Sequence, residues 1–152
     1  MEVRDATPAD LPSIVAMYAD DALGAGREQP GLPLDERYVS AFAAIHGDPN
    51  HRLVVGLVGD EVAATLQLSF LPTLTHRGAE RAQIESVRVA TGQRGEGLGR
   101  QLVEWAVETA RARGCGQVQL MTDVTRADAR RFYESLGFRA SHLGMKLPLG
   151  TG

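Results

Sequence analysis

The stretch Val87–Arg100, Val-Arg-Val-Ala-Thr-Gly-Gln-Arg-Gly-Glu-Gly-Leu-Gly-Arg, runs from an alternating strand pattern through a turn into a long amphipathic helix. Three glycines lie in the turn, at Gly95, Gly97 and Gly99. Glycine lets a backbone approach a ligand closely, and the first N–H groups of a helix have no intrahelical acceptor and carry partial positive charge. The stretch therefore predicts an anion site for a phosphate or pyrophosphate, which Arg94 and Arg100 could strengthen with charge-assisted hydrogen bonds.

Two well-known glycine motifs do not fit this turn. A P-loop closes with Gly-Lys-Ser/Thr, whereas Gly99 is followed by Arg100 and Gln101. A dinucleotide-binding turn has the spacing Gly-x-Gly-x-x-Gly after the first strand of a parallel unit, and here the spacing is Gly-x-Gly-x-Gly after several strands. A pyrophosphate site of another kind and an ordinary strand-to-helix turn remain as the two interpretations.

The chain has 152 residues, of which 43% are hydrophobic and 23% charged, and its formal net charge is −3. These values predict a single domain, residues 1–152, with a core of its own. No basic stripe indicates a nucleic-acid partner. No secretory signal or membrane-spanning run is visible, so no membrane partner and a cytoplasmic location are expected. The four histidines and the single cysteine, Cys115, do not form a metal-binding pattern, so no metal is expected.

The hydrophobic patterns predict the element order β-α-α-β-β-β-α-β-α-β. The expected strands are Met1–Ala6, Arg52–Val58, Val62–Leu71, Ala82–Ala90, Gln117–Thr122, Phe138–His142 and Met145–Leu149. The expected helices start at Thr7 and run to about residue 23, and then cover Asp35–Ile45, Gly97–Arg113 and Arg126–Leu136. The fold class is α/β (α+β), with a mixed, mostly antiparallel central sheet and helices on both faces.

Three features of the chain together resemble the GCN5-related N-acetyltransferase (GNAT) superfamily. Residues Arg94–Gly99 match its Arg/Gln-x-x-Gly-x-Gly/Ala acetyl-CoA signature, and Val87–Val89 lie where the family has its pantetheine-binding strand. Residues Arg131–Phe138, Arg-Phe-Tyr-Glu-Ser-Leu-Gly-Phe, match the closing helix-to-strand signature. The resemblance covers nearly the whole chain, and Thr122–Tyr133 is most similar to small-molecule acetyltransferases of the aminoalkylphosphonate type.

The resemblance implies an enzyme that uses acetyl-CoA as its cosubstrate. The pyrophosphate is expected on the backbone of the glycine turn, and the pantetheine arm is expected to pair with the strand before it, like an added strand. The expected cofactor-binding residues are Val87, Arg88, Val89, Arg94, Gly95, Glu96, Gly97, Leu98, Gly99 and Arg100.

Direct acetyl transfer requires deprotonation of the amine, stabilisation of an oxyanion and protonation of the leaving thiolate. Glu85 is the candidate general base, and the alternative is a solvated strand carboxylate. Tyr133 matches the family's thiolate-protonating tyrosine, and the alternative is a core aromatic residue. The N–H of Val87 is the candidate oxyanion donor, and Ser86 is a further polar candidate. Strand alternation places Glu85, Val87 and Val89 on one face unless a bulge changes the parity.

The expected acceptor is a primary amine of a small molecule, which the family binds through the loops that here are Gly24–Pro33, Pro72–Glu80 and Ser141–Met145. These loops carry both acidic and basic side chains, so they do not select one charge for the acceptor. Many family members have an asparagine where this chain has Arg126, so the asparagine's contact to pantetheine or amine is not carried over. The alternatives are an acetyltransferase for protein N-termini or lysines, and a non-catalytic acyl-CoA sensor. Family members are often dimers, so a homodimer is among the expected partners.

Overall fold

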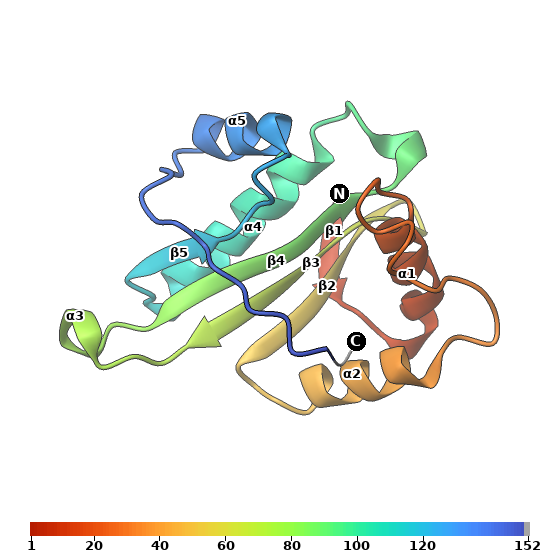
Figure 1. Cartoon of the computed structure of the whole chain (residues 1–152), viewed down its shortest axis with the longest axis horizontal. Helices are drawn as coiled ribbons and strands as arrows, with labels where there is room; N and C mark the ends of the chain where they lie inside the picture. Colours follow the sequence, from red (N-terminus) through yellow and green to blue (C-terminus); the bar gives the residue numbers. More distant parts are fainter. Residues whose placement is uncertain (151–152) are drawn as a thin grey trace. The chain divides into compact units, whose positions relative to one another are not determined.

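Five strands form one sheet in the order β1-β2-β3-β4-β5 in a computed structural model that describes residues 1–150 (Figure 1). The strands are β1 (Glu2–Asp5), β2 (His51–Val58), β3 (Glu61–Leu71), β4 (Arg81–Val89) and β5 (Gln117–Leu120). The pairs β1–β2, β2–β3 and β3–β4 are antiparallel. The predicted α/β class with a mostly antiparallel sheet is therefore confirmed.

The chain divides into two compact units, Met1–Gln119 and Leu120–Gly152. The first unit holds the sheet and most of the helices, and the second holds the segment around the last helix. The α-helices are α1 (Leu11–Ala19), α2 (Glu36–His46), the single turn α3 (Thr75–Gly78), α4 (Leu98–Arg113) and α5 (Ala127–Ser135). Two short 3-10 helices, η1 (Pro8–Asp10) and η2 (Thr91–Gln93), precede α1 and α4.

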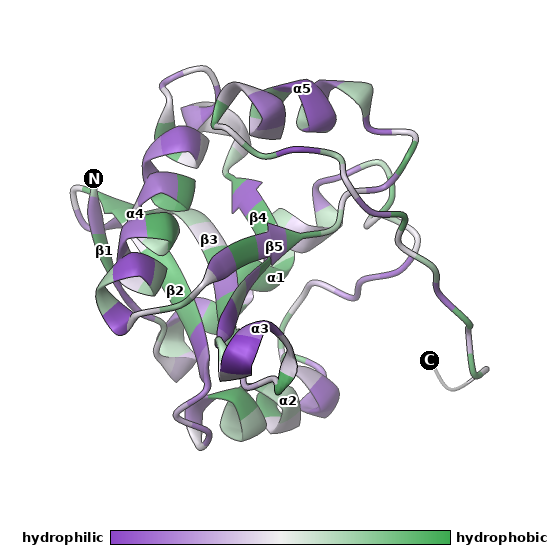
Figure 2. Cartoon of the chain, turned by 90° about the vertical axis from the view of Figure 1, so that its left-hand side faces the viewer, coloured by the Kyte–Doolittle hydropathy of each residue, from purple (hydrophilic) through white to green (hydrophobic). Residues whose placement is uncertain are grey.

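Helices cover both faces of the sheet in the first unit. Leu53 and Val55 of β2 share one face and pack in a buried cluster with α1 and α2, which contribute Ile14 and Phe42 among others. Arg52, which points to the other face by strand alternation, lies 5.0 Å from the ring centroid of Trp105 on α4. Figure 2 shows the corresponding alternation of hydrophilic and hydrophobic residues along α4.

Strand β4 contains a bulge that changes the parity expected from simple alternation. Gln67 of β3 lies opposite Glu85, and Thr65 lies opposite Arg88, so β4 has one more residue than β3 between these pairs. The extra residue falls at Ser86, whose φ of 56° is in the left-handed region. Glu85 therefore shares a face with Arg88 and not with Val89. Simple alternation without a bulge places Glu85, Val87 and Val89 on one face. That expectation is wrong because the extra residue at Ser86 changes the parity of the strand.

Helix α1 ends at Ala19, before the predicted end near residue 23, because the chain curls back on itself. The N–H of Asp20 still donates to the Ala16 carbonyl, and the N–H groups of Gly24 and Ala25 then donate to the Asp21 carbonyl. A Cβ at Gly24 would lie 1.9 Å from the Tyr18 carbonyl oxygen, so this close turn requires glycine.

The predicted closing strands, Phe138–His142 and Met145–Leu149, are not formed within the described residues. The Ser141 N–H donates to the Arg139 carbonyl at 2.9 Å, which turns the chain where the first strand was expected. Pro148 has no N–H with which to contribute to a strand ladder. The apolar alternation in this segment therefore overstated its strand content.

Candidate functional site

The glycine turn leads directly into α4. Gly95 and Gly97 adopt left-handed φ angles of 89° and 76°, and no atom lies within 4 Å of where a Cβ would be at either residue. The N–H of Gln101 donates to the Gly97 carbonyl at 3.1 Å, so the N–H groups of Leu98 and Gly99 precede the first intrahelical bond. The first turn of α4 holds no acidic side chain. The turn thus combines helix N–H groups, open space and a positive helix end, which suits a pyrophosphate.

The two arginines of the turn contact carboxylates of the protein. Arg94 donates through Nη2 to the Asp20 carbonyl at 3.2 Å and through Nε to the Val89 carbonyl at 3.2 Å. Asp20 also accepts from the Thr91 hydroxyl. Arg100 lies 3.4 Å from Glu104 on the exposed side of α4. Arg94 therefore ties the turn to the end of α1, a role that the sequence motif did not indicate.

Glu85 lies just before the bulge, and its side chain is exposed beside Ser86. Val87 and Val89 are half-buried, and the Val87 carbonyl accepts from Nη1 of Arg88 at 2.9 Å. The bulge interrupts the β3–β4 ladder at this point, which leaves irregular backbone next to a carboxylate.

Charged and aromatic side chains from α1 and the following loop surround Arg88. Its guanidinium lies 3.6 Å from the Asp21 carboxylate and 5.9 Å from the Tyr18 ring centroid. Burial raises the pKa of Tyr18 to about 12, while Arg88 lowers it and the carboxylates of Glu28 and Glu85 raise it. Tyr18, Arg88 and the two carboxylates therefore interact electrostatically on the face of the sheet that α1 covers.

Tyr133 lies on α5 in the second unit, where it is half-buried. Its ring packs edge-on against Phe132 and Phe138, with centroid distances of 5.0 and 5.8 Å. Arg126 is the N-cap residue of α5, and its side chain makes no capping hydrogen bond to the helix. The Asp123 side chain holds the turn that precedes Arg126. The Thr125 N–H donates to this Asp123 carboxylate at 2.9 Å.

Sequence reasoning missed several polar contacts of the first unit. The tie between Asp20 and the glycine turn, the Arg88–Asp21 pair and a hydrogen-bonded chain through Gln83 and Gln119 were not expected. The sequence contained a signal for the glutamine contact. Gln83 and Glu85 alternate in one predicted strand, and Gln117 and Gln119 alternate in the next, so the two residues of each pair point to the same face of their strand.

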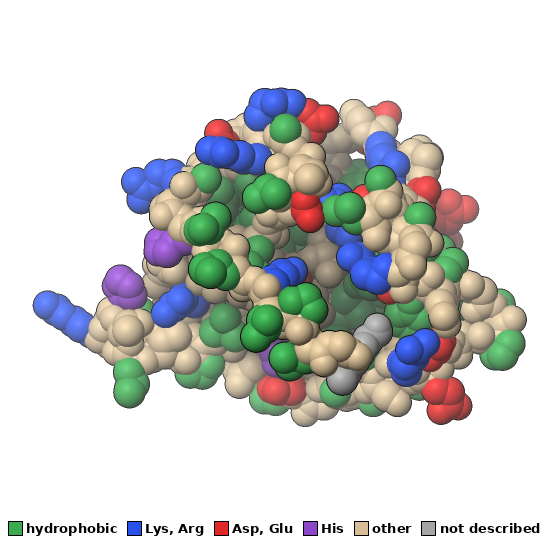
Figure 3. Space-filling model, in the orientation of Figure 1, with side chains coloured by type: hydrophobic (Ala, Val, Ile, Leu, Met, Phe, Trp, Pro, Cys, Tyr) green, Lys and Arg blue, Asp and Glu red, His purple; other side chains and the backbone are tan. Residues whose placement is uncertain are grey.

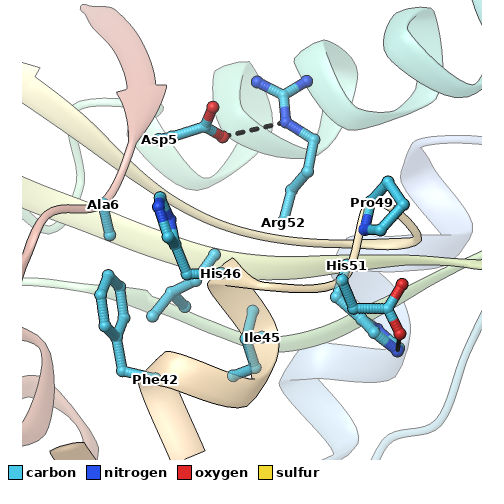
Figure 4. A pocket seen from close by; sticks show the side chains of 10 residues that line it. Asp5, Ala6, Phe42, Ile45, His46, Pro49, His51 and Arg52 are labelled. Carbon is cyan, nitrogen blue, oxygen red and sulfur yellow. Dashed lines mark hydrogen bonds and ion pairs between the residues drawn. The ribbon is translucent and has the colours of Figure 1, made fainter.

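A separate pocket of about 250 Å³ lies between α2 and the adjoining ends of β1 and β2 (Figure 4). Its lining residues are Asp5, Ala6, Phe42, Ile45, His46, Asp48, Pro49, His51, Arg52 and Leu53. The Asp5–Arg52 hydrogen bond of 2.9 Å is drawn at the pocket in Figure 4. None of the predicted site residues lines this pocket.

No cluster of three or more His, Cys, Asp or Glu side chains suited to a metal ion occurs within residues 1–150. In that same part of the chain, every helix is too short or too polar to cross a bilayer. On the face shown in Figure 3, side chains of both charges occur together.

Comparison with known proteins identifies the family. The model of the acetyltransferase (GNAT) family matches residues 14–138. The chain belongs to this family. Among curated GNAT relatives, aminoalkylphosphonate N-acetyltransferase of Salmonella typhimurium is 32% identical over 93% of this chain and 86% of its own. Streptothricin acetyltransferase of Streptomyces lavendulae is 28% identical over 99% of this chain and 87% of its own.

A solved structure agrees with this GNAT fold along almost the whole chain. A protein of Bacillus halodurans C-125, described as a transcriptional regulator, superposes with a TM-score of 0.95 and 49% sequence identity. The alignment covers 97% of this chain and 99% of the other. The family assignment makes the protein an acetyltransferase, and the GNAT family generally uses acetyl-CoA.

Proposed function

We propose that the protein transfers the acetyl group of acetyl-CoA directly to the primary amine of a small molecule, in a ternary complex. One observation carries this proposal: in a chain of the GNAT family, an open glycine turn at the start of α4 follows directly on the bulged end of β4. The first feature suits a pyrophosphate, and the second places an exposed carboxylate nearby in the chain.

The residues of the turn fit the cosubstrate. A Cβ at Gly95 or Gly97 would occupy space that is open, and the N–H groups at the start of α4 are available to phosphate oxygens. The backbone of Val87 and Val89 would bind the pantetheine amides by strand addition. Bound acetyl-CoA supplies an activated acetyl group as a thioester.

Three groups of the chain are assigned chemical roles in the proposal. Glu85 takes a proton from the acceptor ammonium, directly or through a water, so that the amine can attack. The N–H of Val87 donates to the negative charge that develops on the carbonyl oxygen. Tyr133 gives a proton to the departing thiolate.

The comparisons support a small acceptor. The Salmonella relative acts on aminoalkylphosphonates according to its name, and the Streptomyces relative on streptothricin. The carboxylates of Glu28 and Asp21 are largely buried and pair with Arg27 and Arg88, so they do not by themselves select the charge of the acceptor. An acetyltransferase of protein N-termini or lysines is the second candidate within the same chemistry.

The test is a panel of amines with acetyl-CoA, with the release of free thiol as the readout. Release that depends on a small amine supports the proposal, whereas release with peptide amines alone favours the protein acceptor. Acetyl-CoA binding without release for any amine would indicate a sensor, and absence of binding would exclude both. Cys115 is the one cysteine of the chain, so Cys115→Ser removes the protein's own thiol from the readout.

Three further sequence predictions remain part of the proposal: a single domain, a cytoplasmic location and a homodimer. Sedimentation of the purified chain measures the last of these directly.

A further inference from the structure

A chain of hydrogen bonds through β4 and β5 ends on Glu85. Gln83 Nε2 donates to Glu85 Oε1. Gln119 Nε2 donates to Gln83 Oε1 at 2.9 Å, and Arg81 Nη1 donates to Gln119 Oε1 at 3.5 Å. All four residues belong to the first unit, and the chain runs from a cation to a carboxylate.

The direction of the bonds is the same at every step. Gln83 and Gln119 each accept through the carbonyl oxygen and donate through the NH2 group to the next residue, and Gln119 Oε1 also accepts from Gln117 Nε2 at 3.5 Å. Such chains polarise their members, so the donor that reaches the carboxylate is strengthened by the bonds behind it. Arg81, Gln83 and Gln119 are half-buried, whereas Glu85 is exposed. The interior of the chain is thus partly shielded from water, and its acidic end is accessible to an acceptor.

Glu85 depends on this support because of its place in the strand. It precedes the bulge residue Ser86, and a long exposed side chain would otherwise sample several rotamers. Within residues 1–150, Gln83 is the side chain that hydrogen-bonds to the Glu85 carboxylate, through Oε1. Oε2 is then the oxygen that can receive a proton.

We propose that Gln83 is a positioning residue that holds the Glu85 carboxylate in one orientation for proton abstraction, and that Gln119 and Arg81 support it. This inference rests on the general-base role proposed above for Glu85. In the step concerned, an N–H bond of the acceptor ammonium breaks and an O–H bond forms at Oε2. The electron pair stays on the nitrogen, which becomes the nucleophile.

Other groups also face Glu85. Arg88 shares its face of β4, and α1 contributes Tyr18, on which Glu85 acts electrostatically. The loop after α1 contributes Glu28, which acts on the same tyrosine. Opposite Glu85 on β3 lies Gln67, which is uncharged. Substitutions in the amide chain leave all these charges in place, so they test Gln83 separately.

The main experiment compares Gln83→Leu with the unaltered protein. The readouts are kcat and KM with the best amine of the panel, and the affinity for acetyl-CoA, which needs no acceptor. Loss of the Gln83 donor lets the Glu85 side chain sample other rotamers, so kcat falls by roughly tenfold, a part of what general base catalysis contributes. The affinity for acetyl-CoA stays within about twofold of the original value, because the glycine turn is unchanged.

Gln67→Leu is the matched control because it removes an amide directly across from Glu85 that makes no part of the chain. Its kcat stays within about twofold of the original value. Gln119→Leu lowers kcat in the same way as Gln83→Leu but less, and the double variant equals Gln83→Leu alone, since Gln119 acts through Gln83. If Gln83→Leu fails to fold, the kcat of Gln119→Leu decides the question.

An unchanged kcat in Gln83→Leu, an equal fall in Gln67→Leu, or additive effects in the double variant would overturn the inference. Failure of the proposed base role is separate. It would be seen as a kcat of Glu85→Gln equal to that of the unaltered protein.

Discussion

Tyr133 is the residue whose chemical role depends on a single oxygen atom. Its ring packs against Phe132 and Phe138, and phenylalanine keeps that packing. We expect Tyr133→Phe to lower kcat by roughly 10²-fold, because general acid catalysis is worth about that much, while affinity for acetyl-CoA changes little. Steady-state kinetics and acetyl-CoA titration by calorimetry measure the two quantities.

The same variant supplies its own structural control. Its melting temperature is expected to stay near that of the unaltered protein, because the aromatic contacts remain. A fall in affinity equal to the fall in kcat, or an unchanged kcat, would remove the acid role from Tyr133.

Gly97 has a backbone conformation that favours glycine, and it borders the open space proposed for acetyl-CoA. Its φ of 76° is unfavourable for a branched side chain, and the space beside it is open. We expect Gly97→Val to abolish measurable acetyl-CoA binding, since the side chain fills the site and the turn must shift. Equilibrium binding of acetyl-CoA is the measurement.

Gly114 provides a matched control for Gly97. It caps the other end of α4 with a φ of 90° and also has open space around it. Gly114→Val should strain the backbone to a similar degree and lower stability, yet leave acetyl-CoA affinity within about twofold of the original value. Equal losses of affinity in both variants would mean that strain in α4, and not occupied space, explains the Gly97 result.

At the scale of elements, the junction between β1 and α1 is held by one carboxylate. Asp10 is buried, accepts from the Thr7 N–H at 2.8 Å and pairs with both terminal nitrogens of Arg4, at 2.7 and 3.1 Å. Arg4, followed by Thr7, keeps the pKa of Asp10 below its ordinary value despite the opposing effect of burial. The sequence predicted a helix start at Thr7, whereas the pairing of Asp10 with Arg4 on β1 was not predicted.

The lowered pKa of Asp10 gives a pH prediction. A carboxyl group with a depressed folded-state pKa stabilises the fold above its unfolded value, near 3.8, and this contribution is lost as the pH falls through the folded value. We expect Asp10→Asn to lower the free energy of unfolding at pH 7 by about 1–2 kcal/mol. Urea unfolding from pH 7 to pH 2 measures the difference, which should shrink toward the acid end. A difference that is constant over this range would contradict the assignment.

The bulge in β4 shows what an element pattern can and cannot predict. Residues 81–89 alternate well enough to predict a strand, and the strand is present. The extra residue at Ser86 depends on register with β3, a contact between distant segments that periodicity does not contain. The same limit applies to Phe138–His142 and Met145–Leu149, whose alternation is compatible with a strand but which need a partner to become one.

At the scale of the whole molecule, the sequence predicted the fold class because its signals are long and mutually consistent. The amphipathic pattern of α4, the two consecutive strand patterns at Arg52–Val58 and Val62–Leu71, and the glycine turn each restrict the architecture, and the family motifs follow one another in the expected order. The polar contacts of the candidate site were less predictable. Asp20 reaches Arg94, and Gln119 reaches Gln83, only because the sheet and α1 bring separate segments together.

Arg113 connects three such segments of the first unit, so its loss should affect the cooperative stability of the whole unit. Its guanidinium pairs with Glu80 at 2.7 Å, donates to the Asn50 side chain at 3.0 Å and lies 3.8 Å from the Phe70 ring centroid. We expect Arg113→Ala to lower the unfolding free energy by about 1 kcal/mol, through lost packing of its stem and lost cation–π contact. The midpoint of urea unfolding measures this effect.

Arg111 is the matched control for Arg113, because it lies on the same helix and pairs only with Glu108 among the described residues, with both side chains largely exposed. An exposed pair of this kind contributes little, so Arg111→Ala should shift the free energy by less than about 0.5 kcal/mol. An unchanged urea m-value in both variants would mean that the unit still unfolds as one. Equal urea midpoints for the two variants would show that the contacts of Arg113 add no stability. A lower midpoint for Arg113→Ala alone would place the stabilisation in the contacts that Arg113 of α4 makes with β3 and with the loop before β2.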